Sequence, residues 1–424
     1  MRILFDKPRM PDDSFKYVLC ENDKITYISE TKPEGSFDRI IDCKQKMLFP
    51  GLYNCHTHAA MTLFRGYGAD LPLDRWLNEK IFPAEDRLTP RSVYAASMLA
   101  CAEQIKNGIV SFSDMYFFCD ETVKASIESG MRANISRCIV SFDPTEKLAD
   151  SPRFAEAKSL FETYHNAADG RIKIDMSLHA EYTNLEHICA GVGEYAAANN
   201  AGLQLHLSET EKEHNECIGR HGKTPTKFFA DAGVFGARTT AAHCVWVTDD
   251  DMDIMAQYGV TAAHNPVSNL KLGSGVMPLS KMLAKGINVT LGSDGTASNN
   301  TLDILKEMYT AAILHKGIER KCDNYTAADI VKLACENGAK AQGREDCGRI
   351  ETGCKADLIL LDLDAVNAIP VYDSCGALVY ALGSSNVCMT MVDGKILYEN
   401  GEYKTIDIER TKAEMRDVCD HYFD

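Results

Sequence analysis

The sequence lacks the short cysteine pairs and long apolar runs that mark several common classes of protein. None of its 16 cysteines forms a CxxC pair, and they are scattered through apolar stretches. We therefore interpret them as reduced thiols used as small apolar side chains rather than as a disulfide framework. The first five residues are too short an apolar run for a secretory signal, and no run approaches the about 18 residues of a membrane span. We expect a cytoplasmic protein without membrane contact.

Positive charge is also scarce. The chain of 424 residues has 45 Lys and Arg against 61 Asp and Glu, which gives a formal net charge of −16. A chain this acidic repels phosphate backbones, so we exclude binding to a nucleic acid polymer. Hydrophobic residues make up 45% and charged residues 25% of the chain, as in globular proteins with a large core. Internal repeats, low-complexity segments and long linkers are missing from the sequence as well.

What the sequence contains is a series of short apolar runs, several ending in polar residues, that alternate with amphipathic segments. The runs are 47–49, 109–112, 133–140, 172–178, 203–205, 239–242, 260–263 and 287–291. The amphipathic segments include 91–106, 152–167, 185–198, 249–257 and 278–285. Eight strand–helix units predict an α/β fold with a (β/α)8 TIM-type barrel. A doubly wound sheet is the alternative, but it does not readily explain polar residues at the strand ends of all the units.

Strand-like sequence also flanks the predicted barrel at both ends of the chain. Residues 17–28 and 387–398 each have the pattern of a hairpin, the second around an Asp-Gly turn. The simplest assembly joins both ends of the chain in one small β-sandwich. We therefore predict a composite β domain from residues 1–50 and 346–424, with a helix at its C-terminal end, beside a barrel formed by residues 51–345.

The strongest chemical signal is His56-Thr57-His58 after the first run. Side chains two apart on a strand point to the same side, so both imidazoles can bind one cation. His206, His243 and Asp294 follow other runs, and a TIM barrel brings the C-terminal ends of its strands to one mouth. Histidines with a carboxylate suit zinc or another borderline divalent metal. On its own, the His-x-His pair could instead be two polar residues at a strand end.

Other titratable residues lie close to these positions. Glu209 follows His206 by three residues, where a carboxyl can move protons without binding the metal, although the spacing does not distinguish it from Glu211. His179 remains open as a substrate contact or a ligand of a second metal, and His264 as a turn residue. No lysine ends the fourth run to bridge two metals, so one ion is favoured. The histidines that we expect at the surface are His165, His187, His214, His221 and His315.

Several longer motifs resemble those of the amidohydrolase superfamily. They are 49–58 (FPGLYNCHTH), 241–244 (AAHC), 264–273 (HNPVSNLKLG) and 291–300 (LGSDGTASNN), with support from 82–89 (FPAEDRLT) and 114–117 (DMYF). Together they are similar to the deaminase/chlorohydrolase branch, closest to the 5′-methylthioadenosine/S-adenosylhomocysteine deaminases, and the resemblance runs nearly from end to end.

This resemblance implies a barrel hydrolase with one divalent metal ion, zinc as first choice and iron or manganese as alternatives. The implied ligands are His56, His58, His206 and Asp294. In such enzymes Asp294 would also take a proton from water, His243 would orient that water, and Glu209 would protonate the purine ring. The implied reaction is hydrolytic deamination of 5′-methylthioadenosine, S-adenosylhomocysteine or adenosine to the inosine analogue and ammonia.

The resemblance also implies how a small nucleoside would be bound. The implied contacts are Glu85, His179, Arg137, Trp76, Glu209 and Asp294. Glu85 matches the residue that holds the ribose hydroxyls, and Arg137 matches an arginine near the 5′ substituent. A second family arginine, which helps to bind the homocysteine carboxylate, has no clear counterpart around residues 143–147. The preferred 5′ substituent is therefore left open.

Two other functions are compatible with parts of the pattern. The same site could act on another heterocycle, such as guanine, a pterin, a cytosine-like base or a triazine, but a ribose-binding Glu85 would then have no purpose. A non-catalytic barrel scaffold is disfavoured because all the implied ligands are present. The sequence leaves the native metal and the oligomeric state undetermined, and a homo-oligomer is compatible with it.

Overall fold

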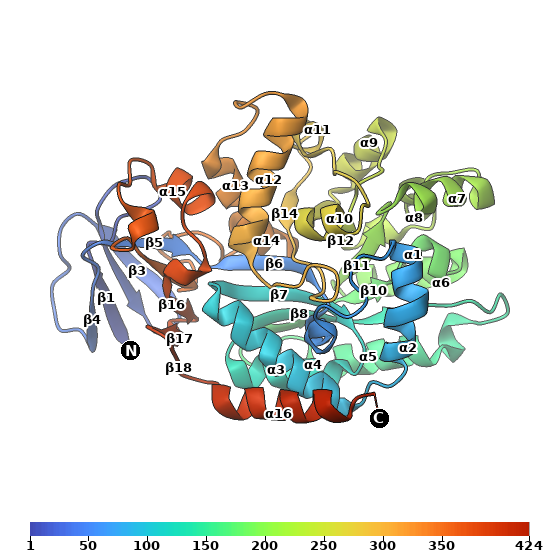
Figure 1. The fold of residues 1–424 in the computed structure, drawn as a ribbon, viewed down its shortest axis with the longest axis horizontal. Helices are drawn as coiled ribbons and strands as arrows, with labels where there is room; N and C mark the ends of the chain where they lie inside the picture. Colours follow the sequence, from blue (N-terminus) through green and yellow to red (C-terminus); the bar gives the residue numbers. More distant parts are fainter. Residues whose placement is uncertain (424) are drawn as a thin grey trace.

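Parallel strands form a nearly closed barrel at the centre of the computed structural model, which describes residues 1–423 (Figure 1). They are β6 (Leu52–Thr57), β7 (Ile109–Tyr116), β8 (Arg132–Ile139), β10 (Met176–Leu178), β11 (Gly202–Leu207), β12 (Arg238–His243), β13 (Thr261–His264) and β14 (Val289–Leu291), with β9 (Ile172–Ile174) paired to β8. The Asp294 amide donates to the His56 carbonyl at 2.9 Å, which brings the segment after β14 beside β6. The predicted α/β fold with a TIM-type barrel is confirmed.

The first predicted barrel strand was wrong in its position. Residues 47–49 lie in β5 (Lys46–Pro50), which pairs antiparallel with β15 (Leu358–Asp362) outside the barrel. The chain then passes directly into β6 through Gly51. A Cβ at Gly51 would lie 2.2 Å from Cγ1 of Val110, so only glycine allows this close passage between the two sheets.

Helices cover the outside of the barrel, as Figure 1 shows. They are α3 (Pro90–Lys106), α4 (Cys119–Ser129), α5 (Pro152–Tyr164), α6 (Glu186–Ala198), α7 (Glu211–His221), α8 (Pro225–Asp231), α9 (Asp249–Tyr258), α10 (Pro266–Lys271), α11 (Leu279–Ala284), α12 (Ile304–Glu319), α13 (Ala327–Ala334) and α14 (Glu336–Ala341). Their ends follow local sequence signals. The Thr89 hydroxyl accepts from the Ser92 amide at 3.1 Å before α3, and Gly130 ends α4 with φ 87°.

Both ends of the chain form the β-sandwich expected beside the barrel. One sheet has the order β3-β2-β1-β4, and the other has the order β18-β17-β16-β15-β5. The remaining strands are β1 (Arg2–Asp6), β2 (Tyr17–Glu21), β3 (Lys24–Ser29), β4 (Arg39–Asp42), β16 (Val387–Val392), β17 (Lys395–Glu399) and β18 (Glu402–Tyr403). Phe5 and Val18 from the first sheet share a buried core with Leu48 and Met391 from the second.

Two helices in the C-terminal part of the chain pack against the barrel helices, and the first of them also contacts the segment between β1 and β2 through the hydrogen bond from Ser374 to Asp13. α15 (Ser374–Tyr380) contacts α12 and α13, and α16 (Ile408–His421) runs along α3 (Figure 1). Leu378 accordingly belongs to the barrel core, and Met415 packs in the same cluster as Val93. The exact division of the chain between the two predicted domains stays a prediction.

The cysteines in the described part of the chain are all free, and most are buried. Among residues 1–423, no helix is both long enough and apolar enough to cross a membrane.

Candidate metal centre and substrate pocket

Three histidines converge at the mouth of the barrel. His56 lies in β6, His58 follows the end of β6, and His206 lies in β11. The ring centroids of His56 and His58 are 5.0 Å apart, and those of His58 and His206 are 5.4 Å apart. One side-chain nitrogen from each residue lies within 4.8 Å of the others. The structure therefore brings together the His-x-His pair and a histidine about 150 residues further along the chain.

The hydrogen bonds of these histidines fit a bound cation. The Nδ1 atoms of His58 and His206 lie 2.6 Å and 2.7 Å from the backbone carbonyls of Met115 and His179. A carbonyl only accepts, so each Nδ1 carries the proton and each Nε2 keeps a free lone pair. These two Nε2 atoms face each other at 3.4 Å, and the buried Nε2 of His56 has no hydrogen-bond partner among the described residues. Such converging lone pairs need a positive charge between them.

The protonation of the cluster agrees with this interpretation. Burial is the main cause that lowers the pKa of His56, His58 and His206 below the usual value for histidine. Neutral imidazoles are the form that binds a metal ion. The residues present therefore fit the metal that the sequence predicts.

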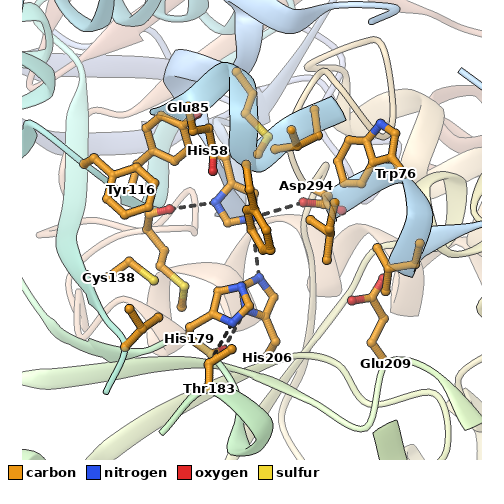
Figure 2. A pocket seen from close by; sticks show the side chains of 18 of the residues that line it. His58, Trp76, Glu85, Tyr116, Cys138, His179, Thr183, His206, Glu209 and Asp294 are labelled. Atoms are coloured by element: carbon orange, nitrogen blue, oxygen red, sulfur yellow. Dashed lines mark hydrogen bonds and ion pairs between the residues drawn. The ribbon is translucent and has the colours of Figure 1, made fainter. Parts of the chain in front are cut away.

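Asp294 follows β14 and adjoins the histidine cluster (Figure 2). Its Oδ1 lies 3.4 Å from Nε2 of His58. Its Oδ2 accepts hydrogen bonds from the hydroxyls of Ser268 at 2.6 Å and Ser298 at 2.8 Å. Burial would raise the pKa of the Asp294 carboxyl, but His243, His58, the Ser268 hydroxyl and the Gly295 amide hold it below the ordinary value. Asp294 is thus an oriented, ionised carboxylate.

His243 ends β12 beside the cluster, although it is not one of the three histidines that form the candidate ligand group. Its Nδ1 lies 2.8 Å from the side-chain oxygen of Asn269, so Nδ1 donates and Nε2 is free to accept. That Nε2 lies 3.7 Å from Oε2 of Glu209. His243 is therefore placed next to the metal centre with a fixed ring orientation.

The structure separates Glu209 from Glu211, which the sequence could not do. Glu209 is buried and lines the cavity, whereas Glu211 starts α7 and is exposed. Burial raises the pKa of Glu209, which favours a protonated carboxyl. Glu213 holds the loop in place, because it accepts from the amides of Ser208 at 3.0 Å and Glu209 at 2.7 Å. By its place in the sequence Glu213 is expected to be a solvated charge, but its carboxyl is buried because it accepts these two hydrogen bonds.

A cavity of about 450 Å³ extends from the metal centre to the barrel mouth. Its lining includes all six residues for which the sequence predicts substrate contacts: Trp76, Glu85, Arg137, His179, Glu209 and Asp294. Figure 2 shows Glu85 beside Tyr116 on one side of His58, and Trp76, Asp294 and Glu209 on the other. A cavity of this size can hold a nucleoside.

Individual pocket residues are fixed by their neighbours. Burial raises the pKa of Glu85 to about 7, against the opposing effect of the Tyr116 phenol. The Nε of Arg137 donates to Glu156 at 2.6 Å, and its guanidinium lies 5.1 Å from the centre of the Phe117 ring. Arg137 is thus held at the edge of the pocket by a carboxylate and an aromatic face.

A second arginine that the sequence interpretation did not find also lines the cavity. Arg153 is the second residue of α5 and belongs to the pocket lining with Arg137. It lies beyond residues 143–147, a stretch that contains no arginine. The loop between β8 and α5 spans residues 140–151, so the arginine that reaches the cavity lies at the start of α5 and not within residues 143–147.

The prediction that five histidines lie at the surface was wrong for two of them, which are buried in the structure. His315 in α12 is buried, and its Nε2 lies 3.0 Å from Nε2 of His264, which is itself buried at the end of β13. His214 in α7 is also buried and lies 3.2 Å from the Ser208 hydroxyl. Both lie on helix faces that pack against the barrel, which a helical pattern alone does not reveal. Neither lines the cavity in the described chain.

Fold and site together define a barrel protein with a histidine-rich metal centre at the C-terminal ends of its strands. The sequence profile of the amidohydrolase family matches residues 47–397. The chain belongs to the amidohydrolase family, and the resemblance found in the sequence is confirmed.

Curated relatives match most of the chain. The 5′-deoxyadenosine deaminase of Methanosarcina acetivorans is 44% identical over 403 residues, which cover 95% of this chain and 92% of that protein. The 5-methylthioadenosine/S-adenosylhomocysteine deaminase of Thermoanaerobacter pseudethanolicus is 42% identical over 394 residues, which cover 93% of this chain and 91% of that protein. The chain is therefore similar along its length to enzymes named for adenosine-type substrates.

Solved structures show the same architecture. An adenosine deaminase from Xanthomonas campestris with bound zinc has a TM-score of 0.93 and 30% identity, and the match covers 100% of this chain and 98% of that one. An atrazine chlorohydrolase from Arthrobacter aurescens has a TM-score of 0.93 at 22% identity, covering 98% and 100%, and this likeness concerns the fold alone. The zinc of the first structure and the histidine cluster here support a metal ion in this family member.

Proposed function

We propose that this protein is a metal-dependent deaminase of adenosine-type nucleosides that releases ammonia and the inosine analogue. The observation that carries the proposal is that one cavity is lined both by histidines of the metal-binding cluster and by Glu85, a half-buried carboxyl. A metal ion bound by the histidine cluster suits hydrolysis, and the Glu85 carboxyl suits the hydroxyls of a ribose. The names and the identity of the curated relatives support the same reaction.

The proposed metal ligands are the histidine cluster and the adjoining carboxylate, that is His56, His58, His206 and Asp294. Zinc is the proposed ion, since it prefers imidazole and carboxylate ligands in four-fold coordination; iron and manganese are the alternatives. When bound, the ion acts as a Lewis acid that lowers the pKa of water from 15.7 to about 7.

The chain's own residues move the protons. Asp294, ionised and held by two serine hydroxyls, accepts a proton from the attacking water. The Nε2 of His243, whose ring orientation is set by Asn269, accepts a hydrogen bond from the same water and aligns its oxygen with C6 of the purine. Each such general acid or base role contributes about 10²–10⁴-fold in rate.

Glu209 completes the proton transfers. Burial raises the pKa of its carboxyl, which favours the protonated form, and Glu209 donates that proton to the purine ring nitrogen as the oxygen adds to C6. Negative charge then does not accumulate on the ring. The proton held by Asp294 passes to the amino group, the bond between C6 and that nitrogen breaks, and ammonia leaves. The hydroxyl on C6 gives its proton to Glu209 as the C6 carbonyl forms, which restores the protonated carboxyl.

The remaining lining residues suit a nucleoside with a variable 5′ group. Glu85 would accept hydrogen bonds from the ribose hydroxyls, while Trp76 and His179 border the base. Arg137 and Arg153 would face the 5′ substituent. We therefore propose a substrate range that includes 5′-methylthioadenosine, adenosine and S-adenosylhomocysteine, whose carboxylate the second arginine would meet.

Release of ammonia from a panel of compounds tests the proposal. The zinc-loaded protein should deaminate adenosine, 5′-deoxyadenosine, 5′-methylthioadenosine or S-adenosylhomocysteine at neutral pH, and should leave guanine and cytosine unchanged. Activity on a free base or a triazine but on no nucleoside would favour the alternative heterocycle hydrolase. In that case Glu85→Ala should not affect substrate affinity, whereas it should weaken binding of a nucleoside.

We also propose that the protein acts in the cytoplasm on this small-molecule partner, which the free, mostly buried cysteines support. The oligomeric state is testable by sedimentation velocity, and a homo-oligomer is compatible with the proposal.

A further inference from the structure

One wall of the cavity comes from a short helical segment between β6 and α3 instead of a barrel strand. It comprises α1 (Leu73–Trp76), the π-helical η2 (Leu77–Ile81) and α2 (Phe82–Glu85), and we call residues 73–85 the wall segment. Seven residues at or next to it line the cavity, including Trp76 and Glu85. The position of the wall segment therefore sets where the proposed ribose-binding carboxyl lies.

The polar contacts on its outer side are weak. Asp74 pairs with Lys212 of α7 at 3.2 Å, but both side chains are more than half exposed. The Trp76 indole donates to the Tyr67 carbonyl at a long 3.4 Å, and Tyr67 is itself only a few residues away in the chain. The α2 end of the wall segment packs through Ile81 and Ala84 in an apolar cluster with Phe64. Exposed ion pairs contribute little to stability, so the contacts at α1 do not provide a polar anchor at α2.

The end of the chain supplies that anchor. α16 lies along α3, and the next residue, Tyr422, donates its hydroxyl proton to the Ala84 carbonyl at 2.8 Å. Ala84 directly precedes Glu85. The two partners are 338 residues apart in sequence, so this contact ties the C-terminal segment to the wall of the pocket.

Aromatic contacts extend the anchor to both sides of the wall segment. The Tyr422 ring meets Phe64 edge-on at 5.6 Å, and the Phe423 ring stacks on Tyr67 at 5.1 Å with an interplanar angle of 25°. On the other side, the Arg87 guanidinium lies 5.9 Å from the centre of the Phe423 ring. Aromatic pairs of this geometry are favourable beyond their buried area. Tyr422 and Phe423 thus contact residues before and after the wall segment.

Tyr422 also interacts electrostatically with Glu85, the proposed ribose-binding residue. After burial, the Glu85 carboxyl is the main cause that raises the pKa of Tyr422. Neither Tyr422 nor Phe423 is among the described residues that line the cavity. Their effect on Glu85 must therefore pass through the backbone of α2 and the packing of the wall segment.

We propose that Tyr422 and Phe423 are positioning residues that hold the wall segment closed against the barrel, so that Glu85 and Trp76 are already in place when substrate arrives. The expected effect of these two residues on substrate binding rests on the proposed nucleoside specificity. Their mechanical role, which is to hold the wall segment in place, does not. Pre-ordering a binding wall strengthens binding because less conformational entropy is lost on association.

Hydrogen exchange on the ligand-free protein tests the mechanical role. In Tyr422→Phe, and more strongly in the double variant Tyr422→Ala/Phe423→Ala, amides of residues 64–88 should exchange faster while those of β10 to β12 stay unchanged. Tyr403→Phe is the matched control, because the Tyr403 hydroxyl donates to the Ala102 carbonyl at 3.0 Å, away from the wall segment. Unchanged exchange at 64–88 in the double variant would overturn the proposal.

Binding of two probes tests the consequence for substrate. Purine riboside contains the ribose and purine lacks it. The double variant should therefore bind purine riboside about tenfold more weakly and purine with little change. Tyr422→Phe should lose about two- to tenfold in its affinity for purine riboside, which is the range for one hydrogen bond of about 1 kcal/mol. An equal loss for both probes, or no loss despite faster exchange, would contradict positioning of Glu85. If the unaltered protein does not bind purine riboside, the proposed function fails, and the exchange experiment alone decides the anchor.

Discussion

Glu209 and His243 face each other at the floor of the cavity, with Oε2 and Nε2 3.7 Å apart. Burial raises the pKa of the Glu209 carboxyl. Burial alone would lower the pKa of His243, but the carboxyls of Glu209 and Asp294 raise it. The proposed proton donor and the histidine proposed to orient the water thus lie next to each other beside the histidine cluster.

The first prediction concerns proton donation. Glu209→Gln should keep the metal content of the protein but reduce kcat by about 10²–10⁴-fold, because the amide cannot supply the proton to the ring nitrogen. Metal analysis and ammonia release on the same sample measure both quantities. Glu211→Gln is the matched control, since that carboxyl is exposed and its loss should leave turnover within about twofold. Unaltered turnover in Glu209→Gln would rule out the proton-donor role.

The second prediction concerns the metal centre. Asp294→Ala should lose both bound metal and activity, because the variant removes the carboxylate beside His58 and the acceptor of the water proton. Treatment of the unaltered protein with a chelator should also abolish activity, and added zinc should restore it. Metal stoichiometry and ammonia release are the measurements. Full activity after complete removal of metal would contradict the proposed chemistry.

The third prediction follows from the titration of Glu85. Its pKa of about 7 means that the carboxyl is largely protonated at lower pH and ionised at higher pH. Ribose hydroxyls donate more strongly to an ionised carboxylate, so the KM for a nucleoside should fall as the pH rises from about 6 to about 8. Glu85→Gln should remove this dependence and raise KM at the higher pH by about tenfold.

A neighbouring carboxyl provides the control for that pH dependence. Asp86 contributes to the raised pKa of Glu85, so Asp86→Asn should keep the dependence of KM on pH but move its midpoint to lower pH. Steady-state kinetics between pH 6 and pH 8 on all three proteins, at about one-half pH intervals, would show the shift. A flat KM profile in the unaltered protein would exclude Glu85 as the titrating group.

The fourth prediction concerns the 5′ substituent. Arg153→Ala should raise the KM for S-adenosylhomocysteine by about tenfold or more, because a hydrogen bond between charged groups contributes about 1.5–3 kcal/mol. The KM for adenosine, which has no carboxylate, should change little. Comparison of the two substrates in the same variant is the internal control. An equal effect on both would show that Arg153 supports the fold of the pocket instead of the 5′ group.

The sequence was most informative where the chemistry depends on local geometry. Two histidines separated by one residue on a strand share a face in any strand, so the pairing of His56 and His58 needed no tertiary information. Alternation of apolar runs and amphipathic segments similarly predicts the parallel barrel, because strand and helix periods are properties of the local chain. The barrel then dictates that residues after its strands meet at one mouth, which is why His206 and Asp294 could be predicted with them.

Other features depend on which distant surfaces pack together. Residues 47–49 have the pattern of a barrel strand, but their hydrogen-bond partner is β15, which lies more than 300 residues later. His315 has a helical pattern typical of the surface, and only the packing of α12 against the barrel buries it beside His264. A sequence pattern shows how apolar and polar residues alternate along a segment, whereas the burial of that segment depends on which other element packs over it.

The sequence by itself determined the alternation of strands and helices, the family motifs and the pairing of His56 with His58, because these are encoded in local spacing. Only the tertiary structure decided that Glu209 and not Glu211 enters the cavity, that Arg153 joins Arg137 at its wall, and that Tyr422 holds the backbone next to Glu85. Each of these depends on loop conformation or on contacts between remote parts of the chain, and local spacing carries no information about either.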